Sequence, residues 1–257
     1  MPANSLFDIT GKTAIVTGAS WGIGRMLADG LADAGARVYL VGRNQADLGA
    51  VVAAIRSRGG EAHALSADLG QHAEVKRLAE EYATREERLD ILVNNVGAMV
   101  EASLEDFTPE QWDHVVHMCM GLPFFLAQAL MPQLRAAADP DDPARIINIG
   151  SADGIKAPFL STYPYPAAKA GIHHLTKQMA KVLGPDGIAV NAIAPGAFPS
   201  RRADPVLETH LDDFIAATPL RRIGRPDDMA GTVVYMSSRA GSYLNGAVLS
   251  LDGGLVV

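Results

Sequence analysis

The stretch "TAIVTGASWGIGRMLADGLADAG", residues 13–35, contains an apolar run, a glycine-rich turn and a helical pattern in direct succession. Residues 13–17 are short and largely apolar, which is typical of a strand buried on both faces. The helical pattern ends at Gly35, a residue type that commonly closes a helix. Because the turn lies between a strand and a helix, its backbone amides are placed to meet a phosphate group. The stretch therefore predicts the first unit of an α/β fold with a phosphate site.

Six further β-rich runs follow, separated by helical patterns; they lie at 37–41, 62–66, 90–94, 145–149, 188–193 and 247–251. Regular alternation of strand and helix implies right-handed crossovers and a parallel sheet that is covered on both faces. We therefore expect a single α/β domain over residues 1–257, a doubly wound, Rossmann-type parallel sheet of about seven strands with helices on both sides.

Composition limits the classes of partner and compartment. The chain has 257 residues, 48% of them hydrophobic, and a net charge of -7 that disfavours nucleic acid. Cys119 is the only cysteine and no signal-peptide pattern opens the chain, so we expect a cytoplasmic, reduced setting. The longest apolar stretch, 118–132, is too short and interrupted to span a bilayer, and we expect it inside a buried helix over 109–136.

The glycine turn has the spacing G-x-x-x-G-x-G, formed by Gly18, Gly22 and Gly24. Gly18 is suited to a tight turn, and the other two glycines allow a ligand and the sheet to approach the backbone. A glycine turn after a strand is also common as a plain connection. Its meaning therefore depends on the motifs that accompany it.

The segment "STYPYPAAKAG", residues 161–171, places two tyrosines before one lysine. Tyr165 and Lys169 are four residues apart and share a helix face, whereas Tyr163 points elsewhere and is expected in the pocket wall. Pro166 suits the first turn of such a helix. A tyrosine, with an ordinary pKa of about 10, is a sluggish acid near neutrality, and an adjacent ammonium would lower that pKa. Ser151 follows a predicted strand and lies at the carboxyl edge of the sheet, where ligands bind.

Six motifs in this order resemble the short-chain dehydrogenase/reductase family over nearly the whole chain. They are "TGASWGIG" (17–24), "NNVG" (94–97), Ser151, "YPAAK" (165–169), "APG" (194–196) and "LDGG" (251–254). Within the family, "ARIINIGSADGI", "YPYPAAK" and "NAIAPGAFPSR" are similar to β-ketoacyl reductases of the rhamnolipid-pathway type.

The resemblance implies a catalytic set of Ser151, Tyr165 and Lys169. Tyr165 would shuttle the proton, Ser151 would polarise the substrate carbonyl, and Lys169 would also bond the nicotinamide ribose. Taken without the family, Tyr165 could equally be a half-buried structural tyrosine and Ser151 a turn residue. The implied cofactor contacts are Gly18, Ser20, Trp21, Gly22, Ile23, Gly24, Arg43, Asp68, Leu69, Asn95, Gly97, Tyr165, Lys169, Pro195, Gly196 and Phe198.

The end of the second strand bears on the choice of cofactor. Gly42 stands where NAD-dependent members tend to have Asp, and Arg43 follows it, which favours NADP because a guanidinium pairs with the 2′-phosphate. NAD remains possible, because Trp21 replaces the second basic residue of NADP users. Asp68 and Leu69 look like the adenine contacts, although Asp68 could instead cap the helix at 70–84.

One position departs from the family pattern. Alignment on "PFF" places Cys119 where members usually carry an asparagine that completes a relay. A thiol is a weak donor and acceptor, so it would hold a water beside the lysine poorly. Either His117 or extra water substitutes, or turnover is slower, or the protein has lost efficient chemistry.

The remaining expectations concern substrate and assembly. Residues 196–228 are long, proline-rich and arginine-rich, and are a candidate substrate lid whose arginines meet an anionic substrate or form a solvated face. The seven histidines show no metal spacing, so no metal is expected. The resemblance implies a homo-oligomer, a tetramer or dimer.

The function expected from these features is an NADPH-dependent carbonyl reductase acting on a small-molecule ketone or alcohol, with a 3-oxoacyl compound as one option. The alternatives are an NAD-linked secondary alcohol dehydrogenase and a catalytically weakened dinucleotide-binding sensor or scaffold.

Overall fold

Seven parallel strands form one sheet in the computed structural model, which describes residues 3–200 and 204–257. The strand order is β3-β2-β1-β4-β5-β6-β7, so the chain winds outward in both directions from β1 and β4. The strands are β1 Thr13–Thr17, β2 Arg37–Gly42, β3 Glu61–Ser66, β4 Ile91–Asn94, β5 Ala144–Ile149, β6 Ile188–Pro195 and β7 Val248–Leu251. The predicted doubly wound sheet is confirmed, and the apolar runs mark its strands because β1, β4, β5 and β6 are buried along their whole length.

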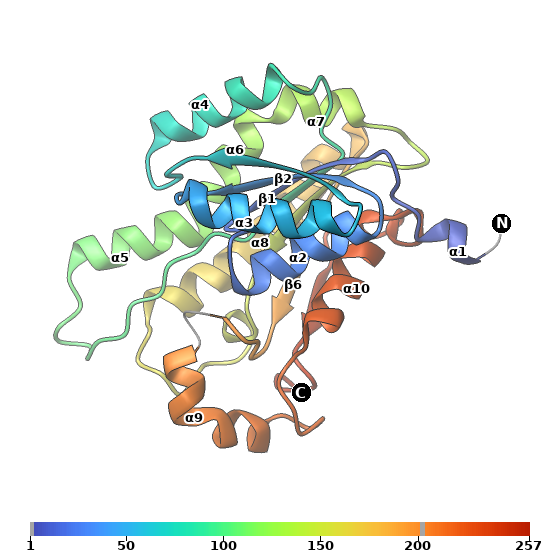
Figure 1. Cartoon of the computed structure of the whole chain (residues 1–257). Helices are drawn as coiled ribbons and strands as arrows, with labels where there is room; N and C mark the ends of the chain where they lie inside the picture. The colour runs from blue at the N-terminus through green and yellow to red at the C-terminus, as the bar shows by residue number, and fades with distance from the viewer. Residues whose placement is uncertain (1–2, 201–203) are drawn as a thin grey trace.

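Helices cover both faces of the sheet and enclose two hydrophobic cores. One core contains α2 Gly22–Asp33, α3 Gln45–Ser57 and α10 Pro226–Ser237. The other contains α4 His72–Ala83, α6 Leu122–Ala129 and α8 Pro164–Leu183. Figure 1 shows α2 beside α10, although they come from opposite ends of the chain. A Cβ added at Gly30 would lie 2.6 Å from the Ala230 Cβ, so these two helices pack at close range.

The single helix expected over 109–136 is wrong, because the segment is divided. It consists of α5 Pro109–Val116, a π-helical turn at His117–Gly121, α6, and α7 Met131–Ala137, which lies at 64° to the preceding helices. Pro132 lacks an amide donor and restricts the residue before it, which explains the break near Leu130.

Among the described residues, no single helix has the length and apolarity needed to cross a membrane. The bent pair Pro109–Ala129 and Met131–Ala137 passes the same criteria of length and composition together.

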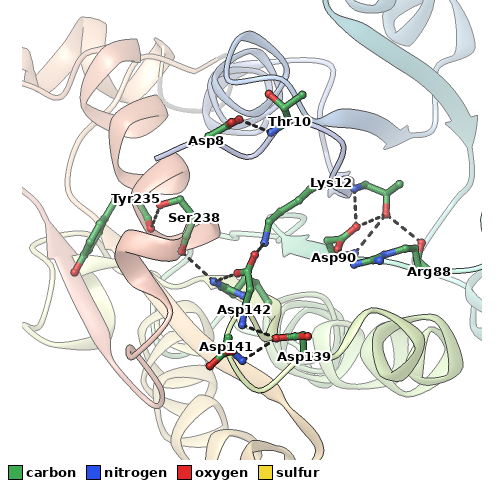
Figure 2. Close-up of polar contacts among 12 residues, drawn as sticks. Asp8, Thr10, Lys12, Arg88, Asp90, Asp139, Asp141, Asp142, Tyr235 and Ser238 are labelled. Atoms are coloured by element: carbon green, nitrogen blue, oxygen red, sulfur yellow. Dashed lines mark hydrogen bonds and ion pairs between the residues drawn. The ribbon is translucent and has the colours of Figure 1, made fainter. Parts of the chain in front are cut away.

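Ion pairs join the strands at the edge where they begin (Figure 2). Lys12 precedes β1 and donates to the Asp142 carboxylate at 2.7 Å, and Arg145 at the start of β5 donates to the same carboxylate at 2.7 Å. Arg145 is 1% exposed and also donates to the Ser238 carbonyl, next to α10, at 2.9 Å. The Asp142 carboxylate therefore pairs with two cationic side chains, one of them buried. They lie at the edge where the strands begin, opposite the carboxyl edge where ligands bind in such sheets.

Replacing Asp142 with asparagine should destabilise the protein at neutral pH. Burial alone would raise the pKa of Asp142, but Lys12 and Arg145 outweigh it and lower that pKa below 3.8. The carboxylate therefore contributes stability above the unfolded value, and this contribution is lost as the pH falls through the lower folded value. We expect a loss of roughly 1–3 kcal/mol at pH 7. The melting temperatures of the two proteins should converge as the pH falls through the lowered pKa of Asp142; a difference that stays constant from neutral pH into this acid range would contradict this assignment.

Candidate active site

A cavity of about 690 Å³ opens at the carboxyl ends of the strands. Crevices at this edge are where ligands bind in open α/β sheets. It is lined by every residue that the sequence analysis assigned to catalysis or cofactor binding: Gly18, Ser20, Trp21, Gly22, Ile23, Gly24, Arg43, Asp68, Leu69, Asn95, Gly97, Ser151, Tyr165, Lys169, Pro195, Gly196 and Phe198. Their individual roles remain predictions, but the fold brings all of them to one place.

The glycine turn is held against the sheet and against the loop after β4. Gly18 has φ +65 and its amide donates to the Val41 carbonyl at 2.8 Å. Asn95 donates from Nδ2 to the Thr17 carbonyl at 2.9 Å. A Cβ added at Gly24 would lie 2.1 Å from the Gly18 carbonyl oxygen, so α2 starts directly on the turn. The turn therefore presents backbone and the start of a helix to the cavity.

Tyr165 and Lys169 project from the first turns of α8 on one face, as their spacing predicts. The Lys169 Nζ lies 5.5 Å from the centroid of the Tyr165 ring and donates to the Ile149 carbonyl at 2.7 Å. Ser151 follows β5, is 7% exposed, and accepts a hydrogen bond from the Asp153 amide at 3.1 Å through its Oγ. A hydroxyl, a phenol and an ammonium thus converge where the sheet ends.

The expectation that Tyr163 forms the pocket wall is wrong. Its ring is 42% exposed and packs edge-on against Phe107, with centroids 5.7 Å apart. Tyr163 precedes α8, and its side chain does not line the cavity in the part of the chain that the structure describes.

His173 contacts the backbone of Ser151 and was not predicted to do so. Its Nε2 accepts a hydrogen bond from the Ser151 amide at 3.4 Å, and a Cβ added at Gly150 would lie 2.0 Å from this nitrogen. Burial, followed by the charges of Lys169 and Lys177, lowers the pKa of His173 to about 4. The ring is therefore neutral and accepts through Nε2. The sequence contains one clue, since His173 is one helical turn beyond Lys169 on the same face.

Cys119 lies in the π-helical turn, and its thiol is bound to backbone. The Ala98 amide donates to Sγ at 3.4 Å, and Sγ donates to the Ala98 carbonyl at 3.2 Å. A Cβ at Gly97 would lie 3.3 Å from the Cys119 Sγ and 3.7 Å from the Lys169 Nζ, so the thiol and the ammonium flank this glycine. The hydrogen bonds of the Cys119 thiol therefore hold the loop after β4 in place next to Lys169. π-Helical turns inside helices are frequent at functional sites.

His117 is not positioned to substitute for the asparagine that the family usually carries at the position of Cys119. Its ring packs against His72 with centroids 5.0 Å apart, and burial first, then His72 and His114, lower its pKa. Among the described residues, His117 is absent from the cavity lining.

The far end of the cavity carries one exposed arginine and two carboxylates. Arg43 follows β2, and the Trp21 Nε1 donates to the Asp47 carboxylate at 3.1 Å. Asp68 accepts from the Gly70 amide at 3.3 Å, and α4 begins at His72 with Gln71 as its N-cap. Asp68 therefore forms the turn before α4 and does not cap the helix.

The opposite end of the cavity is mainly apolar. Its lining there includes Met99, Leu160, Phe214 and Leu255, with His114 and Asp153 as polar members. These residues come from five separate segments, which is why spacing in the sequence gives no clue to them.

The predicted lid at 196–228 contains α9 Asp204–Ala217, which is kinked at His210. The Phe159 ring packs against His210 and against Phe214, so the loop after β5 contacts α9, whose Phe214 lines the cavity. Arg201 and Arg202 lie outside the described residues. Arg222 forms an ion pair with Asp228, which favours a structural role for that arginine over substrate contact.

In residues 3–200 and 204–257, no group of three or more His, Cys, Asp or Glu side chains could hold a metal ion. A glycine turn between a strand and a helix, a cavity at the carboxyl edge and a Ser–Tyr–Lys group together define the class of Rossmann-fold oxidoreductases.

Comparison with known proteins agrees with this class. A family model described as Enoyl-(Acyl carrier protein) reductase matches residues 18–256. The rhamnolipids biosynthesis 3-oxoacyl-[acyl-carrier-protein] reductase of Pseudomonas aeruginosa is 41% identical over 96% of this chain and 97% of that protein. The gluconate 5-dehydrogenase of Gluconobacter oxydans is 35% identical over 98% and 97%.

Solved structures agree as well. The Pseudomonas aeruginosa RhlG/NADP active-site complex superposes with a TM-score of 0.95 at 38% identity, covering 98% of this chain and 99% of that chain. A gluconate 5-dehydrogenase from Burkholderia cenocepacia in complex with NADP and tartrate gives a TM-score of 0.90 at 32% identity, covering 98% of each chain. The chain belongs to the short-chain dehydrogenase/reductase family of NAD(P)-dependent oxidoreductases.

Proposed function

We propose that the protein is an NADPH-dependent reductase of medium-sized ketones of the 3-oxoacyl type. The observation that carries the proposal is the convergence of Ser151, Tyr165 and Lys169 on one cavity, beside the glycine turn. The relatives described above include a 3-oxoacyl-[acyl-carrier-protein] reductase and a structure that contains NADP.

The cavity residues fit a dinucleotide. Position 24 has no room for a side chain, because a Cβ at Gly24 would collide with the glycine turn. The backbone therefore carries no side chain at the point where a pyrophosphate would approach the N-terminus of α2. Arg43 supplies a cation at the end of β2 for a 2′-phosphate, and no carboxylate stands at Gly42 to oppose it. Lys169 has three N–H donors, one of which bonds Ile149, and can hold a ribose hydroxyl with another.

Each catalytic side chain has a distinct task in the proposed reaction. When bound, the reduced nicotinamide would supply the hydride. Ser151 donates its hydroxyl proton in a hydrogen bond to the substrate carbonyl oxygen, which holds the oxygen as negative charge develops. Tyr165 transfers its phenolic proton to that oxygen, and the neighbouring Lys169 ammonium stabilises the tyrosinate that remains.

The apolar end of the cavity supports an acyl chain in preference to a polyol. Met99, Leu160 and Phe214 supply apolar surface around the position of a substrate tail. A polyhydroxy substrate would leave several hydroxyls without partners against such a wall, which is costly.

The direct test is oxidation of NADPH by purified protein with 3-oxoacyl thioesters of four to twelve carbons. We expect loss of the cofactor absorbance with at least one of them and a preference for the longer chains. Tight NADPH binding without oxidation by any carbonyl would refute the proposal and favour the dinucleotide-binding scaffold. A higher kcat/KM with NADH than with NADPH would favour the NAD-linked alcohol dehydrogenase.

Replacing Trp21 with arginine should raise the preference for NADPH over NADH by about tenfold, because it adds a second cation near the 2′-phosphate. The matched control is the double variant Trp21→Arg with Asp47→Asn, since Asp47 now bonds the indole and would otherwise pair with the new arginine. The ratio of kcat/KM values for the two cofactors measures the effect. An unchanged ratio in both variants would place the 2′-phosphate away from Trp21.

We also propose a cytoplasmic homo-oligomer, a tetramer or dimer. Trp112 on α5, Phe124 on α6 and Val182 on α8 are 45%, 39% and 59% exposed, which supports contact with a second copy. Cys119 is buried and makes no disulfide, in keeping with a reducing compartment. Light scattering of the purified protein would give the mass of the assembly.

A further inference from the structure

Asp153 lies beside the reacting groups and has no part in the mechanism described above. It belongs to a short 3-10 turn, Ala152–Gly154, between β5 and α8, and it lines the same cavity as Ser151 and Tyr165. Its amide donates to the Ser151 Oγ at 3.1 Å. A Cβ at Gly154 would lie 2.7 Å from the Lys169 backbone, so the turn packs flat on α8 and Asp153 has a fixed position.

The charge of Asp153 is only partly balanced within the site. Burial raises the pKa of this carboxyl, and the Ser151 hydroxyl and the Lys169 charge offset the rise only in part. The substrate end of the cavity otherwise consists mainly of apolar side chains, such as Leu160 and Phe214, which do not screen a charge. An ionised Asp153 therefore places negative potential next to the position of the substrate carbonyl.

We propose that Asp153 is a specificity-determining residue that rejects ketones with a carboxylate near the carbonyl and admits their neutral thioesters, esters and amides. This inference rests on the proposed function. Two carboxylates a few ångströms apart in a poorly hydrated site repel each other strongly, whereas an amide N–H can donate to Asp153.

The experiment compares two substrates of nearly equal shape, 3-oxooctanamide and 3-oxooctanoate, at pH 8. The readout is the ratio of their kcat/KM values with NADPH in the wild type, Asp153→Asn, Asp153→Ala and Asp113→Asn. Asp113 is the matched control, because it is an exposed acid on α5 that is outside the cavity lining. NADPH binding, followed by fluorescence, shows that each variant is folded.

We expect the wild type to prefer the amide, and Asp153→Asn to reduce this preference by about tenfold or more, chiefly through a lower KM for the acid. Asp153→Ala should have the same effect and Asp113→Asn none. A preference that is unchanged in both Asp153 variants, or that falls equally in Asp113→Asn, would overturn the inference while the ketone reductase stands. If the amide and the thioesters are all left unreduced by the wild type, the proposed function itself fails, and the inference fails with it.

Discussion

Replacing Tyr165 with phenylalanine is expected to lower kcat for ketone reduction by about 10³-fold, within the range that a positioned acid contributes. The substitution removes one hydroxyl and keeps the ring that lies 5.5 Å from the Lys169 Nζ. The bond from Lys169 to the Ile149 carbonyl does not involve the phenol, so the lysine should stay in place. NADPH affinity should therefore change less than threefold, and the loss should appear in kcat. Single-turnover oxidation of NADPH measures this step directly.

Tyr163→Phe is the matched control for this experiment. It removes the same hydroxyl two residues earlier, from a ring that is half-exposed and packs on Phe107. This variant should retain normal turnover. Full activity in Tyr165→Phe, or an equal loss in both variants, would show that the proton comes from another group.

The sequence predicted the sheet well because its strands are buried on both faces. Runs such as "TAIVT" and "RIINI" are mostly apolar, and the structure places buried strands at Thr13–Thr17 and Ala144–Ile149. The Tyr165–Lys169 pair was equally predictable from the sequence, because both residues lie on one helix and a spacing of four residues places them on the same face.

Contacts between distant segments were not predictable in the same way. The thiol of Cys119 finds its partners at Ala98, twenty-one positions earlier, and no local pattern specifies that pairing. His173 and Ser151 likewise meet only because α8 packs behind the end of β5. The break near Leu130 is different in kind, because its cause, Pro132, is local and visible in the sequence.

Replacing Gly24 with alanine is expected to weaken NADPH binding by about 100-fold, the upper end of what overpacking by one methyl group costs. The new Cβ would lie 2.1 Å from the Gly18 carbonyl oxygen and 2.5 Å from the Asn95 Nδ2. Neither atom can retreat easily, since Asn95 is bonded to the Thr17 carbonyl and the Gly18 amide to that of Val41. The glycine turn must therefore move away from α2, and its backbone amides are then misplaced for binding the cofactor phosphates.

Gly49→Ala separates this local clash from the general effect of adding a methyl group to a helix. Gly49 lies on the exposed side of α3, and its added Cβ meets nothing within 4 Å. That variant should gain about 0.4–1 kcal/mol of stability, because the unfolded chain loses freedom, and should bind NADPH normally. Titration of NADPH fluorescence, together with thermal melting of both proteins, measures the two effects side by side. If Gly24→Ala binds NADPH as tightly as Gly49→Ala does, the glycine turn does not hold the phosphates, and the cofactor must lie elsewhere in the cavity.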